Sequence, residues 1–302
     1  MCIFMKCLRS NDYNKNESDE INNESLYKIN KDPIEKLNMY SNFKKIGIGA
    51  TSRIYLTKKD NIEYICKCIN RDSLKKGFRE IKILQKINND FFPKLYDFLS
   101  INNNLFIFMN YENSIDIHKY CFEPCRNDIP IILIIDIIKQ MGKAIQSLHS
   151  YNFVHLDLKL ENFVITDKKH VKLIDFGTVR VLYNFEKDLN NIVGTKNYSP
   201  PEIYRYKYHR NSDIWSYAVC IWILIMKDYC FNHNKIKRSY TLEDFPYELF
   251  TFPTDRQIAY LKKYDIKIKE LFKEVFKIFP IDRPEIDVLI NFDYEKYLIT
   301  DK

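Results

Sequence analysis

The 302-residue sequence lacks several features that would point directly to a class of function. Its eight cysteines have no partner cysteines or histidines at zinc-site intervals, so a structural zinc site is not expected. No apolar run can span a bilayer, because the segment 218–226 is too short and 129–145 carries charged residues. The net charge of +7 is mild, which favours a solvated surface over nucleic-acid binding.

The first 42 residues are expected to form a flexible extension. Residues 10–41 are rich in Asn, Lys, Asp, Glu and Ser, and cannot bury enough apolar surface to offset the entropy lost on ordering. Residues 1–9, MCIFMKCLR, are instead apolar. Position 2 is Cys rather than Gly, so the myristoylation signal is absent, and membrane contact is expected only through acylation of Cys2 or Cys7. The alternative is an incidental apolar terminus.

The remaining chain changes from strand-like to helical patterns. Apolar and polar residues alternate over 43–109 as in antiparallel strands, with one helical interruption at LKKGFREIKILQKI. From Ile129 onward the apolar spacing is mainly helical. We therefore expect an α+β fold of two lobes: a small β lobe with one helix at 43–109, a hinge at 110–116 and a mainly helical lobe at 117–298, followed by a tail at 299–302. Since no secretory signal is found, we expect a cytoplasmic protein with reduced thiols.

Two features of the first lobe suggest phosphate binding. GIGATS (47–52) places glycines two apart between strands, where the backbone can approach a phosphate. Ser52 replaces the third glycine of a dinucleotide-binding fingerprint and no helix follows at once, so that fingerprint is excluded; a bulge or hairpin is the alternative. Lys67 lies in an apolar strand where an unpaired charge would be costly. A pair with Glu80 on the following helix would hold phosphates, whereas two unrelated surface charges are the alternative.

Two motifs of the second lobe carry the residues for phosphoryl transfer. HLDLKLEN (155–162) contains Asp157, which can accept a hydroxyl proton, and Lys159, which can neutralise a transferring phosphoryl group. Asn162 and Asp175, in LIDFGT, offer hard oxygen ligands for magnesium, about a dozen residues apart and each expected after an apolar strand.

Taken in order, these motifs make residues 43–298 similar to the eukaryotic protein-kinase family, serine/threonine type. Asp175-Phe176-Gly177 matches D-F-G, and GTKNYSPPE (194–202) resembles the end of an activation segment. SDIWSYA (212–218) looks like the D-x-W-S-x-G helix start, and Arg283 is the expected partner of Glu202.

The resemblance implies transfer of the γ-phosphate of ATP, with Mg²⁺, to a Ser or Thr hydroxyl of a protein. The catalytic residues would be Lys67, Glu80, Asp157, Lys159, Asn162 and Thr195, and the metal ligands Asn162 and Asp175. The ATP-binding residues would be Ile46, Gly47, Ile48, Gly49, Ala50, Thr51, Ser52, Arg53, Ile54, Ile65, Lys67, Met109, Asn110, Tyr111, Glu112, Asp116, Val164 and Asp175. Lys159 and Thr195 are typical of serine/threonine enzymes. Asp116 and Glu161 match positions that often receive basic residues of the substrate.

Departures from the family pattern carry predictions of their own. Leu156 stands where the family has the arginine that gathers a phosphorylated activation loop, and a leucine cannot bind phosphate. Activity is therefore expected not to require phosphorylation of that loop. Ile65 replaces a small residue that packs on adenine, which predicts a tighter or shifted pocket.

We expect a monomeric protein. The main alternative is a pseudokinase that serves as an ATP-binding scaffold or signalling module, which Leu156 and Ile65 would permit. A small-molecule kinase is disfavoured, because 194–204 and 212–218 resemble a peptide-substrate platform.

Overall fold

The computed structural model describes residues 33–49, 52–123, 129–183, 185–231, 246–262 and 264–298. They form two compact units: the described residues up to Ile81 with Lys94–Tyr111, and Lys82–Pro93 with the residues from Glu112 onward. Several positions singled out from the sequence, namely Cys2, Cys7, Ala50, Thr51 and the tail 299–302, lie outside the described residues.

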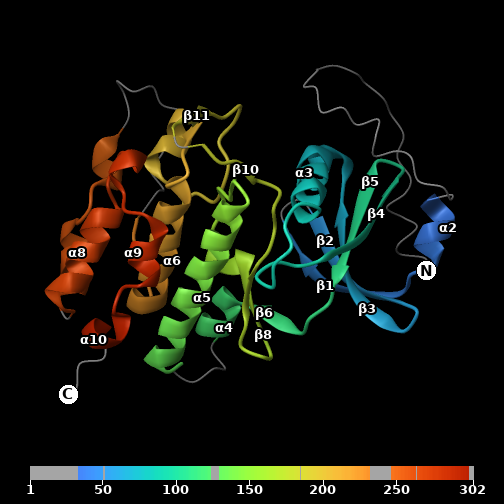
Figure 1. Cartoon of the computed structure of the whole chain (residues 1–302), viewed down its shortest axis with the longest axis horizontal. Helices are drawn as coiled ribbons and strands as arrows, with labels where there is room; N and C mark the ends of the chain where they lie inside the picture. Colours follow the sequence, from blue (N-terminus) through green and yellow to red (C-terminus); the bar gives the residue numbers. More distant parts are fainter. Residues whose placement is uncertain are drawn as a thin grey trace. The chain divides into compact units, whose positions relative to one another are not determined.

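A five-stranded antiparallel sheet forms the first unit (Figure 1). In spatial order the strands are β1 (Ser41–Ile48), β2 (Ser52–Lys59), β3 (Ile62–Ile69), β5 (Asn104–Asn110) and β4 (Leu95–Ile101). Two-residue turns join β2 to β3 and β4 to β5. Asp60 and Asn61 in the first turn, and Asn102 and Asn103 in the second, all have positive φ. Asn and Asp tolerate this conformation, which tight hairpins of matching twist require.

Helix α3 (Leu74–Leu84) packs closely on one face of this sheet, after the short 3₁₀ helix η3 (Arg71–Ser73). A Cβ added at Gly77 would lie 2.6 Å from Leu105 Cδ2 and 2.8 Å from Ile69 Cδ1. Only glycine therefore lets the helix approach the sheet this closely.

The structure corrects the expected extension at its C-terminal end. Residues Pro33–Asn38 form helix α2, and β1 already begins at Ser41. Leu37 and Tyr40 are buried, and the Tyr40 ring stacks on Phe108 with 3.8 Å between centroids. Burial of these two side chains offsets the conformational entropy that is lost when this part of the chain becomes ordered. The expectation of a flexible extension considered only the polar composition of the region.

Two long helices organise the second unit. Helices α5 (Ile131–Ser150) and α6 (Ser212–Met226) lie side by side (Figure 1). All residues of α6 are buried, as its nearly continuous apolar sequence predicts. The remaining helices are α4 (Ile117–Phe122), α7 (Asp255–Leu261), α8 (Ile266–Val275), α9 (Ile286–Ile290) and α10 (Tyr294–Leu298). Among the described residues, none of the helices is sufficiently long and apolar to cross a bilayer.

Short strands and 3₁₀ helices hold the loops of this unit. One small sheet has the order β6 (Ser114–Asp116), β8 (Phe163–Thr166) and β9 (Val171–Leu173). Two further pairs join β7 (Phe153–Val154) to β10 (Arg180–Val181), and β11 (Lys187–Asp188) to β12 (Lys207–Tyr208). The 3₁₀ helices are η4 (Leu160–Asn162), η5 (Pro201–Arg205), η7 (Tyr247–Phe250) and η8 (Pro280–Asp282). The expected α+β class is confirmed.

Candidate active site

Lys67 and Glu80 form a buried ion pair in the first unit. Lys67 Nζ lies 2.9 and 2.7 Å from the two carboxylate oxygens of Glu80. The residues are 7% and 2% exposed, so each charge depends on the other for compensation. The strand lysine and the helix glutamate therefore meet as the sequence predicted, and the surface-charge alternative is wrong.

Three of the apolar residues predicted to contact ATP, Ile54, Ile65 and Met109, share the sheet face of Lys67, whereas the predicted residues Ile48 and Arg53 oppose each other on the other face. Directly opposed residues of a ladder point to the same face, and Ile54 opposes Lys67 while Ile65 opposes Met109. Gly47 opposes Ile54 across a register shift in β1. Around Lys67 this face is thus lined by the apolar side chains of Ile54, Ile65 and Met109. Of the predicted glycine loop, Gly49 N donates to Ser52 O at 2.8 Å, which closes the hairpin.

The catalytic-loop candidate of the second unit is held by Asp213, at the start of α6. Its carboxylate accepts hydrogen bonds from His155 N at 2.8 Å and Leu156 N at 2.9 Å, and contacts His149 Nε2 at 2.9 Å. Leu156 has a φ of 65°, so the backbone here is strained and needs such anchoring. The sequence reasoning noted the D-x-W pattern but gave Asp213 no function; an aspartate opening an apolar helix was the signal.

Asp157 is the centre of a polar network. Thr195 Oγ1 donates to Asp157 Oδ1 at 2.6 Å and accepts from Lys159 Nζ at 3.0 Å. Lys159 Nζ also lies 3.7 Å from Asp157 Oδ2. The backbone carbonyl of Asp157 accepts from Asn162 Nδ2 at 2.8 Å. Four of the predicted catalytic residues therefore meet in the second unit, where the Thr195 hydroxyl fixes the Asp157 carboxylate and the Asn162 amide fixes the Asp157 backbone.

Asn162 and Asp175 are linked through the β8–β9 ladder. Ile174 N donates to Asn162 O at 2.8 Å, and Phe163 opposes Leu173. Asp175, with a φ of 66°, follows β9, whereas Asn162 precedes β8 in η4. The expectation that both follow strands is thus wrong for Asn162, because antiparallel pairing brings the start of one strand beside the end of the next. Phe176 packs edge-on against His155 at 5.9 Å and Phe92 at 5.8 Å.

Two predicted nucleotide-binding acids have partners in the second unit. Asp116 caps α4: its Oδ1 accepts from Lys119 N at 2.8 Å, and its Oδ2 lies 3.1 Å from Lys119 Nζ. Glu112 pairs with Lys172 Nζ. The Asp116 carboxylate therefore has a structural function at a helix N-terminus, whatever further contacts it makes.

Leu156 belongs to an apolar cluster. The segment from Asp175 to Glu202, called the activation segment below, helps to build this cluster. The cluster contains Val154, Leu156, Leu189, Val193, Ile203 and Tyr208, with Tyr183, Ile192 and Tyr206 packed against it. Gly194, at a φ of 86°, lies so close that an added Cβ would be 2.6 Å from the Leu156 carbonyl oxygen. Strand β11 of the segment pairs with β12. The segment is thus attached to the catalytic loop by apolar packing and to β12 by backbone pairing.

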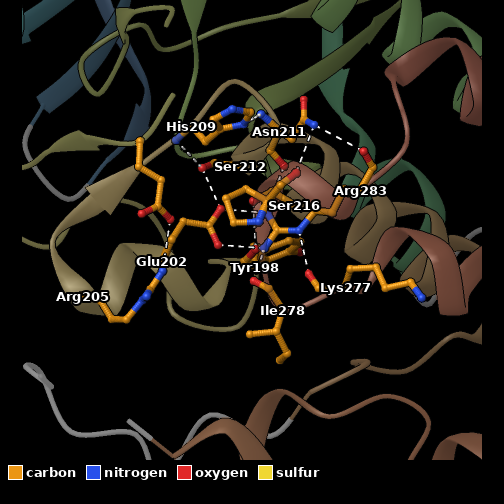
Figure 2. Close-up of polar contacts among 12 residues, drawn as sticks. Tyr198, Glu202, Arg205, His209, Asn211, Ser212, Ser216, Lys277, Ile278 and Arg283 are labelled. Atoms are coloured by element: carbon orange, nitrogen blue, oxygen red, sulfur yellow. Dashed lines mark hydrogen bonds and ion pairs between the residues drawn. The ribbon is translucent and has the colours of Figure 1, made fainter. Parts of the chain in front are cut away.

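The end of the segment is anchored by the predicted pair of Glu202 and Arg283 (Figure 2). Nη1 and Nη2 of Arg283 each lie 2.7 Å from a carboxylate oxygen, and both side chains are 0% exposed. Ser212 Oγ donates to the same carboxylate, and Arg283 also donates to the backbone oxygens of Asn211, Lys277 and Ile278. Burial alone would raise the pKa of Glu202, but the Arg283 guanidinium lowers it below the ordinary value.

Residues 40–294 match the family model described as Protein kinase domain. Serine/threonine-protein kinase kin-29 of Caenorhabditis elegans is 30% identical over 221 residues, which cover 68% of this chain and 26% of that protein. Meiosis-specific serine/threonine-protein kinase mek1 of Schizosaccharomyces pombe is 30% identical over 202 residues, or 60% of this chain and 45% of that protein.

A third relative aligns over more of the chain. Serine/threonine-protein kinase Nek4 of Mus musculus is 24% identical over 273 residues, which cover 86% of this chain and 33% of that protein. The chain therefore spans less than half the length of each of these relatives.

Proposed function

Because the chain belongs to the eukaryotic protein-kinase family, serine/threonine type, we propose that it transfers the γ-phosphate of ATP to a serine or threonine hydroxyl of a protein. The observation that carries the proposal is the network around Asp157: Thr195 donates to the carboxylate, Lys159 donates to Thr195, and Asn162 donates to the Asp157 backbone carbonyl. Phosphoryl transfer needs little covalent chemistry from the protein, so positioned charges of this kind supply most of the catalysis.

Each residue of the network has a distinct chemical function in this proposal. Asp157 orients the substrate hydroxyl and accepts its proton as the oxygen attacks phosphorus. Lys159 neutralises negative charge on the transferring group. Thr195 links the two, since its hydroxyl donates to one and accepts from the other. Because Thr195 lies on the activation segment, the position of that segment determines the position of the catalytic side chains.

The proposed nucleotide-binding residues belong to both units. In the first, the Lys67 ammonium, held by Glu80, contacts the α- and β-phosphates. The backbone amides of residues 47–52 cover the phosphates. The adenine is contacted by Met109, Asn110 and Tyr111. In the second, Glu112 continues the hinge contact, and Val164 and Asp116 lie near adenine and ribose. The buried Lys67–Glu80 pair supports this assignment, because a fixed ammonium binds phosphate at low entropic cost.

The residues proposed to bind Mg²⁺ fit a hard cation. Asp175 offers a carboxylate, and Asn162 directs its Nδ2 to the carbonyl of Asp157, which orients the amide oxygen away from that bond. Mg²⁺ is commonly bound by one or two protein oxygens together with substrate phosphates and waters. When bound, the ion neutralises charge on the β- and γ-phosphates.

Substitution of Asp157 tests the proposal. With Mg²⁺-ATP and a serine/threonine peptide array, Asp157→Asn is expected to lower phosphate incorporation at least 100-fold, with unchanged thermal unfolding. Lys168→Met, at an exposed turn between β8 and β9, serves as the control and should keep wild-type activity. Equal incorporation by wild type and Asp157→Asn would favour the ATP-binding scaffold instead.

We further propose that activity does not depend on phosphorylation of the activation segment. The apolar cluster around Leu156 supports this, because it holds the segment without a phosphate and gives a phosphate no cationic partner at that position. Phosphatase-treated protein is expected to keep its full activity. Leu156→Arg, which places an unpaired cation in the cluster, should lower both activity and the unfolding temperature; loss of wild-type activity on phosphatase treatment would refute the proposal.

In this proposal the protein acts as a cytoplasmic monomer, and its substrates are proteins with an acceptor Ser or Thr. Any preference for basic flanking residues would depend mainly on Glu161, since Asp116 is already engaged by Lys119.

A further inference from the structure

The outer face of the five-stranded sheet, opposite α3, has an apolar core of its own. Directly opposed residues share a face, so Cys66 lies with Phe108, and Cys68 lies with Phe106 and Leu99. All five are buried and belong to one hydrophobic cluster. An antiparallel sheet whose two faces are both apolar needs a cover on each face, and α3 supplies only one.

Helix α2 and the residues after it cover one end of this outer face. The Tyr40 ring stacks on Phe108 and lies edge-on to Tyr64 at 6.0 Å. Lys36 Nζ pairs with Asp97 at 2.7 Å. Directly opposed residues of neighbouring strands form a row across the sheet. Since Asp97 opposes Phe108, these contacts all lie at the rows nearest the end of β5.

The opposite end of the face is equally buried. Phe106 is 2% exposed, Leu99 is 4% and Ile101 is 5%. Residues two apart on a strand are about 6.6 Å apart, so the row of Ile101 lies about 13 Å from the row of Phe108. That distance exceeds the width of the stacked tyrosine ring. Phe43 and Tyr55 also pack against the cluster, but Tyr55 lies in the row of Cys66 and Phe43 lies edge-on to Tyr55. The far rows therefore need an apolar cover beyond these rings.

We propose that residues 1–9, MCIFMKCLR, dock on the outer face and cover its far rows. Only this part of the sequence before α2 is predominantly apolar, whereas residues 10–32 are mainly polar, with Tyr13, Ile21, Leu26, Tyr27 and Ile29 among them. The tether suffices, because a coil of its length has an end-to-end distance of roughly 26 Å, compared with roughly 20 Å across five strands. It also begins at α2, which already lies on this face.

The tether makes even a weak contact effective. A segment linked by a short flexible chain has an effective concentration of about a millimolar, so its docking needs little intrinsic affinity. Cys66 and Cys68 flank Lys67 on β3, and cover over them stabilises the strand that carries the lysine. A docked terminus is also withdrawn from any membrane. The inference does not rest on catalysis, and its test needs no kinase assay.

The test measures the accessibility of the Cys68 thiol in the full-length protein. The variant Ile3→Asp/Phe4→Asp makes the segment polar while it keeps every cysteine. Labelling of Cys68 by N-ethylmaleimide, followed by mass spectrometry of its peptide, is expected to be at least tenfold faster than in wild type. Deletion of residues 14–21 shortens the polar tether and should leave the rate unchanged. Added synthetic peptide 1–9, at millimolar concentration, should restore protection to the variant.

Two results would overturn the inference. Equal labelling rates in wild type and variant, with circular dichroism showing both folded, would mean that another element covers the face. Wild-type protection that falls on dilution, together with a dimer-to-monomer shift in sedimentation, would assign the cover to a second copy of the chain.

Discussion

Two of the buried ion pairs in the part of the chain that the structure describes look alike but have different surroundings. Lys67–Glu80 joins a strand to a helix, with side chains 8% and 3% exposed, whereas Glu202 and Arg283 are 0% exposed. Arg283 additionally donates to three backbone carbonyls and lies over the Trp215 ring at 5.1 Å. A guanidinium satisfied on every side is suited to fixing a loop, whereas a compact ammonium on a sheet face is suited to binding a ligand.

The comparison shows why burial alone does not identify a catalytic charge. Both pairs balance the cost of desolvation by close approach. What distinguishes them is the donor geometry of the cation and the surroundings of the pair, and these can be separated by experiment.

Removal of Arg283 should give the largest effect. Arg283→Ala leaves Glu202 buried without its counter-charge and is expected to lower the free energy of unfolding by about 3–5 kcal/mol. Chemical denaturation measures the change. Arg210→Ala breaks an exposed pair with Glu285 and should cost no more than about 1 kcal/mol. Similar losses in the two variants would contradict an anchoring function for Arg283.

Lys67→Met should affect catalysis more than folding. Loss of the ammonium is expected to lower kcat/KM about 100- to 1,000-fold, or roughly 2.7–4 kcal/mol, while destabilising the protein less than Arg283→Ala does. Lys58→Met, on the neighbouring strand with a half-exposed Glu63 partner, is the matched control and should keep its activity. If the Lys67 variant is unstable but active when folded, Lys67–Glu80 has the same anchoring function as Glu202–Arg283, and the proposed phosphate contact is wrong.

Gly194→Ala should have an intermediate effect through geometry alone. The glycine has a φ of 86°, and a Cβ would meet the Leu156 carbonyl, so Thr195 must move away from Asp157. We expect a ten- to hundredfold lower kcat. Asn191→Ala, at an exposed site of the same segment, is the control; wild-type kcat in Gly194→Ala would show that the network tolerates displacement.

The smallest effect should be a dependence of stability on pH. Because Arg283 lowers the pKa of Glu202 in the folded protein, the pair contributes stability above pH 4.5, the ordinary value, and loses it as the pH falls through the lower folded pKa. As the pH is lowered from 7 to 3.5, the thermal unfolding temperature should therefore fall more steeply for wild type than for Glu202→Gln. Parallel curves would mean that the carboxylate keeps its ordinary pKa.

Local chemistry made much of the fold predictable. Alternating residues in EYICKCI predicted β3 and the apolar run NLFIFMNY predicted β5, while helical spacing predicted α3 and the mainly helical chain from Ile129 onward. The helix α2 could not be predicted in this way, because its six residues are too few to show a helical period. Its stability comes from the burial of Leu37 and Tyr40 on a distant sheet face.

The sequence alone determined the set of chemical groups: a strand lysine, a helix glutamate, an aspartate and lysine on a loop, and an asparagine and aspartate that offer oxygen atoms as candidate metal ligands. The tertiary structure decided which of these groups lie close enough to form ion pairs and hydrogen bonds with one another. It joined Lys67 to Glu80, joined Asp157 to Thr195 across 38 positions, and gave Asp213 the task of holding a strained loop. Hydrogen bonds act over about 3 Å, so such partnerships depend on packing between segments that no local pattern records.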